Sequence, residues 1–157
     1  MIDNTPSSFE NCLILFVSAF ELNGNIKIKM NKLIIDAANN KIFLMIIKSK
    51  NIYSISHENS KTNYDKMIVL INDFLKSNDL KIENISKLYV NRGPGSFAGI
   101  RNSIALVKGI FVAKKIDYYC FSFDDFDQLN KDKYENVPCL CDKYKIKKNL
   151  INPIYLS

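Results

Sequence analysis

The feature that most limits how this chain can fold is a glycine-rich segment at 91–101, with the sequence NRGPGSFAGIR. Gly93, Gly95 and Gly99 are three of the five glycines in the chain, and Pro94 lies between the first two. A hydrophobic strand pattern precedes the segment and a strongly apolar stretch follows it. Glycine allows backbone conformations and close approaches that a Cβ atom forbids, and proline stiffens a turn. The segment predicts a tight, specialised strand-to-helix connection, and we expect function to be located there.

Apolar runs and their spacing predict a mixed α/β fold. We expect strands at 32–36, 42–48, 52–57, 88–91 and 116–122, long helices over 64–78 and 98–114, and a short helix over 123–130. Tight turns make the first three strands an antiparallel meander. Thr62 and Asp65 have the spacing of a capping box at the start of the first long helix. The order β-β-β-α-β-α-β predicts a five-stranded mixed sheet flanked by helices, as in ribonuclease-H-like and actin-like ATPase domains.

Length and charge predict one folded domain with an extension before it. The chain has 157 residues, enough for a sizeable core, and 47% of them are hydrophobic. Residues 1–29 carry three acidic and two basic side chains, and Met30 stands directly before the first predicted strand. We expect 1–29 to be an N-terminal extension outside the fold, with the native protein starting at Met30. The actin-like domain is then 30–130, followed by a short basic C-terminal segment at 131–157.

The formal net charge of +6 is a weak indication of a nucleic-acid partner. Lys, Asn and Ile are abundant and all have A/T-rich codons, so genome composition explains part of the basicity. No dense block of Lys and Arg is interleaved with aromatic residues. The tail lysines 143, 145, 147 and 148 are compatible with contact to nucleic-acid phosphates, but a solvated terminal segment is the favoured interpretation.

Metal and membrane sites are not indicated. The four cysteines lack the spacing of a zinc site, and His57 is the only histidine. Asp124, Asp125 and Asp127 fit a cation site or, more simply, acids at a helix start. The apolar run at 12–20 is shorter than the ~20 residues of a spanning helix. We therefore expect a cytoplasmic protein without a membrane contact and without a metal.

Four interpretations of the glycine segment can be compared. Gly93 to Ala98 satisfies the lenient G-x-G-x-x-G/A pattern of dinucleotide-binding loops, but it follows the fourth strand, and Pro94 lacks an N–H donor. No G-K-[ST] sequence completes a P-loop, and Ser96 lacks the G-x-S-x-G spacing of a hydrolase nucleophile. The structural interpretation fits best: Ser96 caps the following helix and Gly99 lets that helix pack closely.

The helix expected over 98–114 is apolar on two sides. One stripe consists of Ile100, Ile104, Val107 and Phe111; the other consists of Leu106, Ile110 and Ala113, with Gly109 beside them. The sheet covers only one side of such a helix. The second stripe therefore predicts contact with another lobe of the same chain or with a partner protein.

These residues also carry a family resemblance. The segment 91–101 closely resembles the signature G-R-G-P-G-S-F-T-G-[LV]-R of the TsaB (YeaZ) family of bacterial tRNA threonylcarbamoyladenosine biosynthesis proteins. Residues 33–36 (LIID) match the first strand of that family, 108–110 (KGI) its second helix, and 152–156 (NPIYL) its C-terminal E-P-V-Y-L-R. The resemblance covers Met30 to about Phe126, together with the tail.

The resemblance implies an actin-like ATPase fold and a non-catalytic scaffold or activating subunit for tRNA N6-threonylcarbamoyladenosine modification. It also implies pairing with a catalytic, metal-holding TsaD-like paralogue, with a TsaE-like ATPase joining them, a possible homodimer, and only indirect or weak contact with tRNA. The expected partner interface comprises Ser96, Phe97, Arg101, Leu106, Lys108, Ile110, Met67 and Ile71. The motif loop that shapes it comprises Arg92, Gly93, Pro94, Gly95, Ser96 and Gly99.

The chain departs from the family at several positions. Ala37 and Ala38 follow Asp36 where the family usually has Thr and Ser, and actin-like ATPases hold phosphate with Gly and hydroxyl residues in that turn. We therefore expect no nucleotide cofactor. Asn63 stands where the family often has His, which disfavours a catalytic role there. We also expect the family's second lobe to be largely absent. The alternative function is a nucleotide-binding phosphotransferase or hydrolase on the same fold.

Overall fold

The structure, a computed structural model, describes residues 30–155. The predicted extension at 1–29 and the last two residues lie outside the described part of the chain. Within that part, no helix has the length and apolarity needed to cross a bilayer.

The fold is built on one five-stranded mixed sheet with the strand order β3-β2-β1-β4-β5. The strands are β1 (Asn31–Asp36), β2 (Lys41–Lys48), β3 (Asn51–Glu58), β4 (Ile85–Asn91) and β5 (Asp117–Phe121). Strands β1, β4 and β5 are parallel, whereas β2 is antiparallel to both β1 and β3. The meander and the mixed sheet predicted from the sequence are confirmed. All five predicted strands are present, with ends that differ by a few residues.

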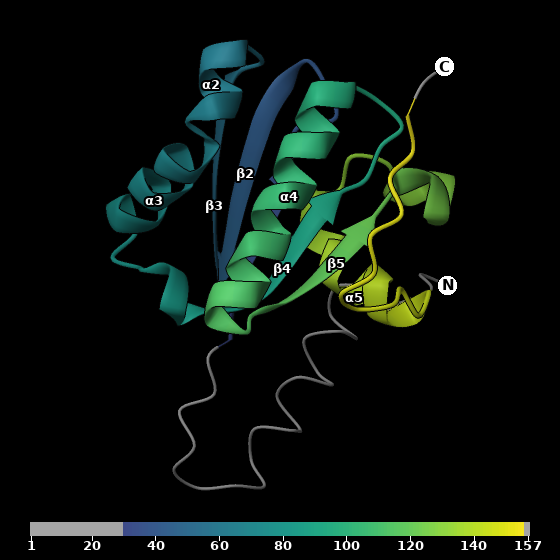
Figure 1. The fold of residues 1–157 in the computed structure, drawn as a ribbon. Coiled ribbons are helices and arrows are strands. Elements are labelled where there is room, and N and C mark those ends of the chain that lie inside the picture. Colours follow the sequence, from purple (N-terminus) through teal and green to yellow (C-terminus); the bar gives the residue numbers. More distant parts are fainter. Residues whose placement is uncertain (1–29, 156–157) are drawn as a thin grey trace, which may run out of the picture.

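Helices cover the two faces of this sheet unequally (Figure 1). The helices are α2 (Lys61–Asp65), α3 (Met67–Ser77), α4 (Phe97–Lys114) and α5 (Val137–Lys143). Helices α3 and α4 lie over one face, and α5 lies with the 3₁₀ turns of the C-terminal part over the other. These turns are η2 (Phe123–Asp125), η3 (Gln128–Asn130) and η4 (Tyr134–Asn136), and a further one, η1 (Ile82–Asn84), precedes β4.

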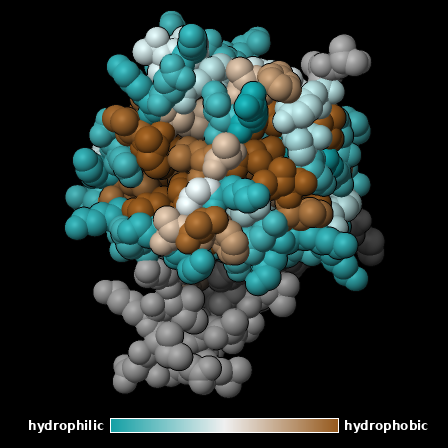
Figure 2. Space-filling view, viewed as in Figure 1, coloured by the Kyte–Doolittle hydropathy of each residue, from teal (hydrophilic) through white to brown (hydrophobic). Residues whose placement is uncertain are grey.

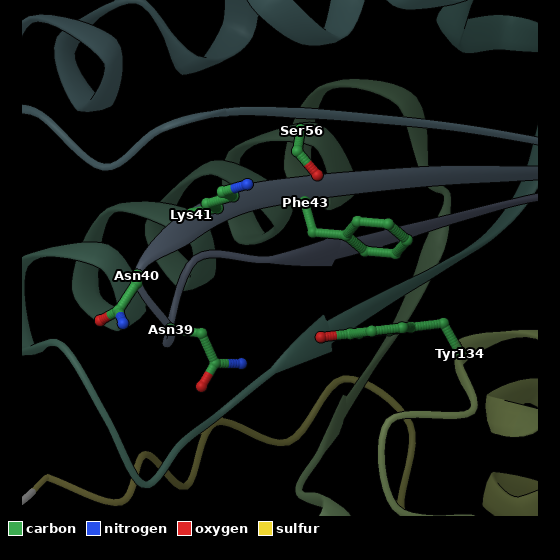
Figure 3. Close-up of a pocket in the computed structure, with 6 residues that line it drawn as sticks. All are labelled: Asn39, Asn40, Lys41, Phe43, Ser56 and Tyr134. Atoms are coloured by element: carbon green, nitrogen blue, oxygen red, sulfur yellow. The ribbon is translucent and has the colours of Figure 1, made fainter.

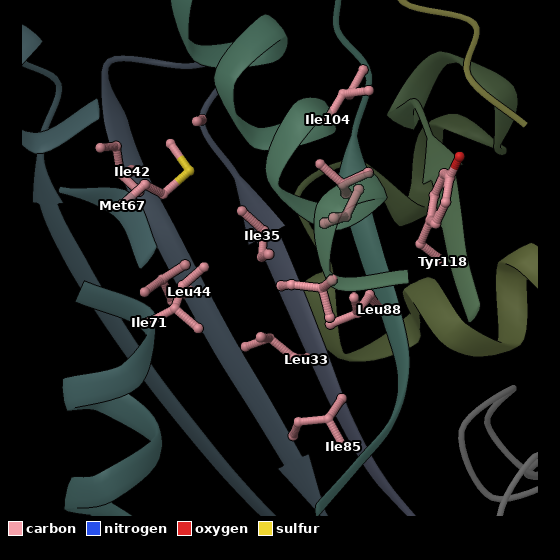
Figure 4. Packing of buried hydrophobic residues seen from close by; sticks show 14 of the residues in the cluster. Leu33, Ile35, Ile42, Leu44, Met67, Ile71, Ile85, Leu88, Ile104 and Tyr118 are labelled. Carbon is pink, nitrogen blue, oxygen red and sulfur yellow. The ribbon is translucent and has the colours of Figure 1, made fainter. Parts of the chain in front are cut away.

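The larger core lies between the sheet and α3 and α4 (Figure 4). Alternate residues of β1, Leu33 and Ile35, point toward this face and are fully buried, as the period of two along a strand requires. The stripe predicted on α4 lies against them: Ile100 and Val107 are fully buried. Burying a side chain of this size stabilises the fold by about 1.5–3 kcal/mol. This core fixes α4, and with it the glycine segment, against the sheet.

A second core lies on the opposite face and is rich in aromatic residues. Tyr89 of β4 and Phe121 of β5 pack there against Phe126 and against Val137 and Leu140 of the C-terminal part. The segment predicted as a basic tail therefore also supplies buried side chains. Periodicity did not predict α5, because its seven residues are too few to show a helical repeat.

Two predicted helical regions differ from the structure. The helix expected over 64–78 is two helices that meet at Lys66. The first is capped by Ser60, whose Oγ accepts a hydrogen bond from the Asn63 amide, and not by Thr62. The break has a packing cause: α2 places Tyr64 against the start of α4, while α3 packs on the sheet. The helix expected over 123–130 is replaced by two 3₁₀ turns.

The two edges of the sheet are treated differently. In the described part of the chain no strand pairs with the outer side of β3, and its side chains are mostly exposed. The outer side of β5 is partly covered by the C-terminal segment: Lys148 forms a β-bridge with Tyr119, and the Asn149 amide donates to the Tyr118 carbonyl at 2.8 Å.

Candidate functional site: the glycine loop and the outer face of α4

The glycine loop passes between two other backbone segments. Gly93 has φ of +101°, a conformation that favours glycine, and a Cβ there would collide with the carbonyl oxygen of Ile154. Cβ atoms at Gly95 and Gly99 would collide with the carbonyl groups of Ala38 and Ala37. The loop thus fits between the β1–β2 turn and the C-terminal tail, so the structural interpretation of the glycines is confirmed.

The loop ends in the helix cap that the sequence predicts. Ser96 precedes α4, and its Oγ accepts a hydrogen bond from the Gly99 amide at 3.3 Å. The Tyr64 hydroxyl lies 3.1 Å from the same Oγ, and the Ser96 amide donates to the Ala38 carbonyl at 2.8 Å. Ser96 therefore links three elements, namely α2, α4 and the β1–β2 turn.

The carboxylate of Asp36 is the buried polar centre behind this loop. Its Oδ1 accepts from the Ala38 amide at 2.9 Å. Its Oδ2 accepts from Asn39 at 3.0 Å, from Asn91 at 2.8 Å and from the Tyr134 hydroxyl at 2.7 Å. Asp36 is fully buried, and an ionised group is retained in such a place only when it is well hydrogen-bonded. Asp36 thereby ties the ends of β1 and β4 to the C-terminal part.

A hollow of about 360 Å³ lies beside Asp36, between the β1–β2 turn and Tyr134. Its lining consists of Asn39, Asn40, Lys41, Phe43, Ser56 and Tyr134. Figure 3 shows Tyr134 extended below Phe43, with its hydroxyl directed toward Asn39, and the two ring centroids are 4.2 Å apart. Burial, with the Asp36 carboxylate second, raises the pKa of Tyr134, so its hydroxyl remains a donor at neutral pH. Tyr134 therefore closes the side of the hollow that adjoins Asp36.

Arg92, the second residue of the motif, holds the loop to the C-terminal part. Its guanidinium pairs with Asp125 at 2.6 Å and donates to the Asn152 carbonyl at 3.1 Å. Its carbonyl accepts from the Ile154 amide at 2.7 Å. The side chains of Arg92 and Asp125 are both largely buried, so this pairing of a guanidinium with a carboxylate has a well-defined geometry. Asp125 therefore has a structural partner, and the described residues contain no cluster of three or more possible metal ligands.

The outer face of α4 is small, apolar and open. Phe97 is 56% exposed at its start and Val112 is 60% exposed near its end. A Cβ at Gly109, between them, would meet no atom within 4 Å. Figure 2 shows hydrophobic residues gathered across the face that carries α3 and α4, with hydrophilic residues around them. We call the group Ile68, Val69, Phe97, Leu106 and Val112 the outer apolar patch.

The structure corrects three of the residues predicted for a partner surface. Met67 and Ile71 of α3 are buried against the sheet, and Ile110 of α4 is 7% exposed in the same core. The stripe assigned to Ile110 fails because Ile110 belongs to the core between α4 and the sheet. Leu106 is half-buried and packs on that core. Phe97, Arg101 and Lys108 are exposed, and Ser96 is half-buried.

Sequence analysis missed several residues of this surface. Ile68 and Val69 of α3 are 40% and 49% exposed, and Val112 lies outside both stripes predicted on α4. Tyr155 of the tail packs on Phe97 with ring centroids 4.7 Å apart and extends the patch. One sequence pattern could have indicated these residues: an apolar side chain that lies outside the buried stripe of an amphipathic helix, as Val69 does.

The fold and the loop together define a class: an α/β protein with an actin-like, ribonuclease-H-like sheet and a glycine loop before its long helix. No family model matches the chain. Two solved structures have this fold, namely YeaZ from Pseudomonas aeruginosa (TM-score 0.56, 16% identity, 66% of this chain and 49% of that one) and a protein from the same organism described as similar to peptidase YeaZ (TM-score 0.55, 18% identity, 59% and 43%).

Two curated relatives name the family. Each is called tRNA threonylcarbamoyladenosine biosynthesis protein TsaB. The one from Buchnera aphidicola of Schizaphis graminum is 28% identical over 90 residues, covering 57% of this chain and 43% of the relative. The one from Buchnera aphidicola of Baizongia pistaciae is 32% identical over 81 residues, covering 45% and 37%. The chain is thus similar to the TsaB (YeaZ) family in sequence and in fold, and it spans less than half the length of these relatives.

Proposed function

We propose that this chain is a non-catalytic subunit of the machinery that makes N6-threonylcarbamoyladenosine in tRNA. The names of the curated relatives support the pathway. The observation that carries the subunit role is the outer apolar patch, which begins at Phe97, directly after Ser96 of the motif loop, extends over α4 and α3, and has the composition of an interface rather than of a reaction site.

In this proposal the patch binds a catalytic TsaD-like paralogue, and a TsaE-like ATPase joins the pair. Arg101 and Lys108 are exposed on α4 beside the patch and supply polar contacts at its rim. Phe97 and Tyr155 form an aromatic pair at one end of it, and aromatic side chains commonly anchor protein interfaces. The expected organisation, with 1–29 as an extension outside the fold, 30–130 as the actin-like domain and 131–157 as a short basic C-terminal segment, belongs to the same proposal.

The alternative, a nucleotide-binding phosphotransferase or hydrolase, fits the Asp36 region less well. All four hydrogen-bond donors at its carboxylate come from the chain itself, and one of them, Tyr134, stands between Asp36 and the neighbouring hollow. Ala37 and Ala38 supply no hydroxyl group for a phosphate. A metal-bound nucleotide would have to displace Tyr134 and break its 2.7 Å hydrogen bond.

The test is co-purification of the tagged chain with the TsaD-like paralogue from the same genome. Val112→Asp places a charge on the outer apolar patch at a side chain that makes little contact within the chain. We expect at least a tenfold loss of affinity for the paralogue with an unchanged circular-dichroism spectrum, because the charge would be buried in the complex. Leu106→Asp tests the same surface, but its side chain also packs on the core.

Leu129→Asp is the matched control, since Leu129 is 83% exposed in the C-terminal part and lies outside the patch. Equal binding by the Val112 and Leu129 variants would refute the proposed surface. Size-exclusion chromatography with light scattering adds a second criterion. If Val112→Asp turns a dimer of this chain into a monomer while paralogue binding persists, the patch serves a homodimer and the proposal is wrong.

A further inference from the structure

Positive charge is concentrated at one end of the sheet. This end, which we call the basic end, contains the first residues of β1, β4 and β5, the β2–β3 turn, and the C-terminal ends of α3, α4 and α5, with the tail segment that follows α5 (Figure 1). Its lysines are Lys32, Lys48, Lys50, Lys76, Lys81, Lys87, Lys114, Lys115, Lys143, Lys145, Lys147 and Lys148. Its acidic residues are Asp79, Glu83, Asp117, Asp142 and Asp127, the last of which pairs with Lys143 at 3.5 Å.

The rest of the described chain is close to neutral. It carries eight positive and eight negative side chains, so the basic end accounts for all of the excess positive charge of residues 30–155. Genome composition raises the lysine content everywhere along a chain, and it does not place the surplus at one end of a fold. The spatial segregation is therefore information that the sequence total of +6 does not contain.

The centre of the basic end is a pair of neighbouring lysines. Lys32 of β1 and Lys87 of β4 are in register, so their side chains project from the same face of adjacent parallel strands about 5 Å apart. Like charges placed directly opposite each other in a sheet destabilise it. Both side chains are half-buried, and burial together with Lys87 lowers the pKa of Lys32. The Asp142 carboxylate offsets part of this repulsion at Lys32.

Aromatic and peripheral groups extend this pair into a broader surface. The Lys87 ammonium lies 5.4 Å from the centroid of the Tyr119 ring. Lys148 pairs with Asp117 at 3.2 Å, which brings the tail to the start of β5. Lys145 and Lys147 flank this contact and are exposed.

The size of the surface fits an extended polyanion better than a single small ion. Five strands at about 4.8 Å spacing make an end about 20 Å wide. Over that length one strand of a duplex presents roughly six phosphates at ~3.4 Å each. Lysines at the β2–β3 turn, at the end of α4 and in the tail lie around this width, on separate elements.

We propose that the basic end binds the phosphate backbone of a structured RNA, with the Lys32–Lys87 pair at its centre. The choice of RNA among polyanions rests on the proposed function, and the site itself rests on the charges and their positions. The contact is electrostatic and does not read sequence. It lies at the opposite end of α4 from the motif loop.

The test uses the full 157-residue chain and a fluorescein-labelled tRNA transcript, measured by anisotropy between 20 and 200 mM KCl. The variant is Lys32→Gln/Lys87→Gln. Its control is Lys61→Gln/Lys66→Gln, which removes the same charge from exposed positions in and beside α2, at the other end of the sheet. Circular dichroism and thermal unfolding establish that both doubles fold.

We expect the parent chain to bind with a dissociation constant of about 1–100 μM at physiological salt, the range of non-specific binding. The Lys32/Lys87 variant should bind at least fivefold more weakly at low salt. The slope of log K against log salt should fall by about 1.4–1.8, because two phosphate contacts are lost. The control should change affinity less than twofold.

Absence of binding by the parent chain, or equal losses in both double variants, overturns the proposal. Vesicles containing phosphatidylserine form a second arm: if they bind the parent chain through Lys32 and Lys87 while the tRNA does not, the surface recognises lipid and the proposal is wrong. Co-purification with the TsaD-like paralogue separates the two proposals. RNA binding that depends on Lys32 and Lys87 stands even if no paralogue is recovered, in which case only the proposed function fails.

Discussion

Two glycines of α4 make a direct test of how closely the motif loop region is packed. Gly99 and Gly109 lie on the same helix, and both would gain helix propensity on substitution by Ala. At Gly109 the added methyl group meets nothing within 4 Å, so Gly109→Ala should stabilise the fold by up to about 1 kcal/mol. At Gly99 it collides with the carbonyl group of Ala37, which is backbone and cannot rotate away. Overpacking of this kind costs about 1–3 kcal/mol, so we expect the two variants to differ by about 2–4 kcal/mol.

The measurement is equilibrium unfolding in urea, followed by circular dichroism at 222 nm. Gly99→Ala should lower the urea midpoint and Gly109→Ala should raise it, with the slope of unfolding free energy against urea unchanged in both. Both variants replace Gly with Ala in the same helix. The effect of the substitution on the free energy of the unfolded chain is therefore the same in both and cancels in the comparison. A Gly99→Ala variant as stable as Gly109→Ala would show that α4 does not pack against Ala37 as described, and the structural interpretation of the motif would be refuted.

Two further predictions concern buried polar groups. Tyr134→Phe keeps the ring beside Phe43 but removes the donor to Asp36, and hydrogen bonds to charged groups are worth about 1.5–3 kcal/mol. We expect Tyr134→Phe to lower the free energy of unfolding in urea by about 1–2 kcal/mol, since Tyr134 is only half-buried. The control, Tyr53→Phe on the exposed strand β3, should cause no loss. Equal urea midpoints for these two variants would contradict the role assigned to Tyr134. Burial, with Lys87 second, lowers the pKa of Lys32, so its protonated form is less stable in the folded than in the unfolded chain. The Lys32→Gln variant should therefore be more stable than the parent chain at pH 7. This difference in stability should shrink as the pH rises through the lowered pKa of the folded chain toward the pKa of about 10.5 in the unfolded chain. A difference independent of pH would contradict the lowered pKa of Lys32.

The sheet and α4 could be predicted from the sequence because their signals are local. The short apolar run of β1 and the stripe from Ile100 to Val107 are each recognisable from neighbouring residues alone. The loop between them was recognisable for a similar reason, since three glycines within seven residues restrict the backbone whatever surrounds it. Ser96 was identified as the cap from its position alone.

The parts that escaped prediction depend on contacts between distant residues. Tyr134 donates to Asp36 across 98 positions, and nothing near either residue indicates the other. The burial of Met67 and Ile110 follows from the way α3 and α4 share one face of the sheet, which a single helical pattern does not specify. The basic end could not be predicted for the same reason. Its lysines are spread over the whole chain and come together only when β1, β4 and β5 lie parallel in the sheet.

The coverage of β5 by Lys148 and Asn149 limits how copies of this protein can join through their sheets. A sheet can extend continuously through many molecules only if each molecule has two unpaired edge strands, each of which pairs with a different neighbour. Within the described residues the outer edge of β3 is unpaired, whereas that of β5 is partly covered by the bridge at Tyr119. Edge-to-edge contact is therefore favoured between two β3 strands about a two-fold axis, which produces a closed dimer.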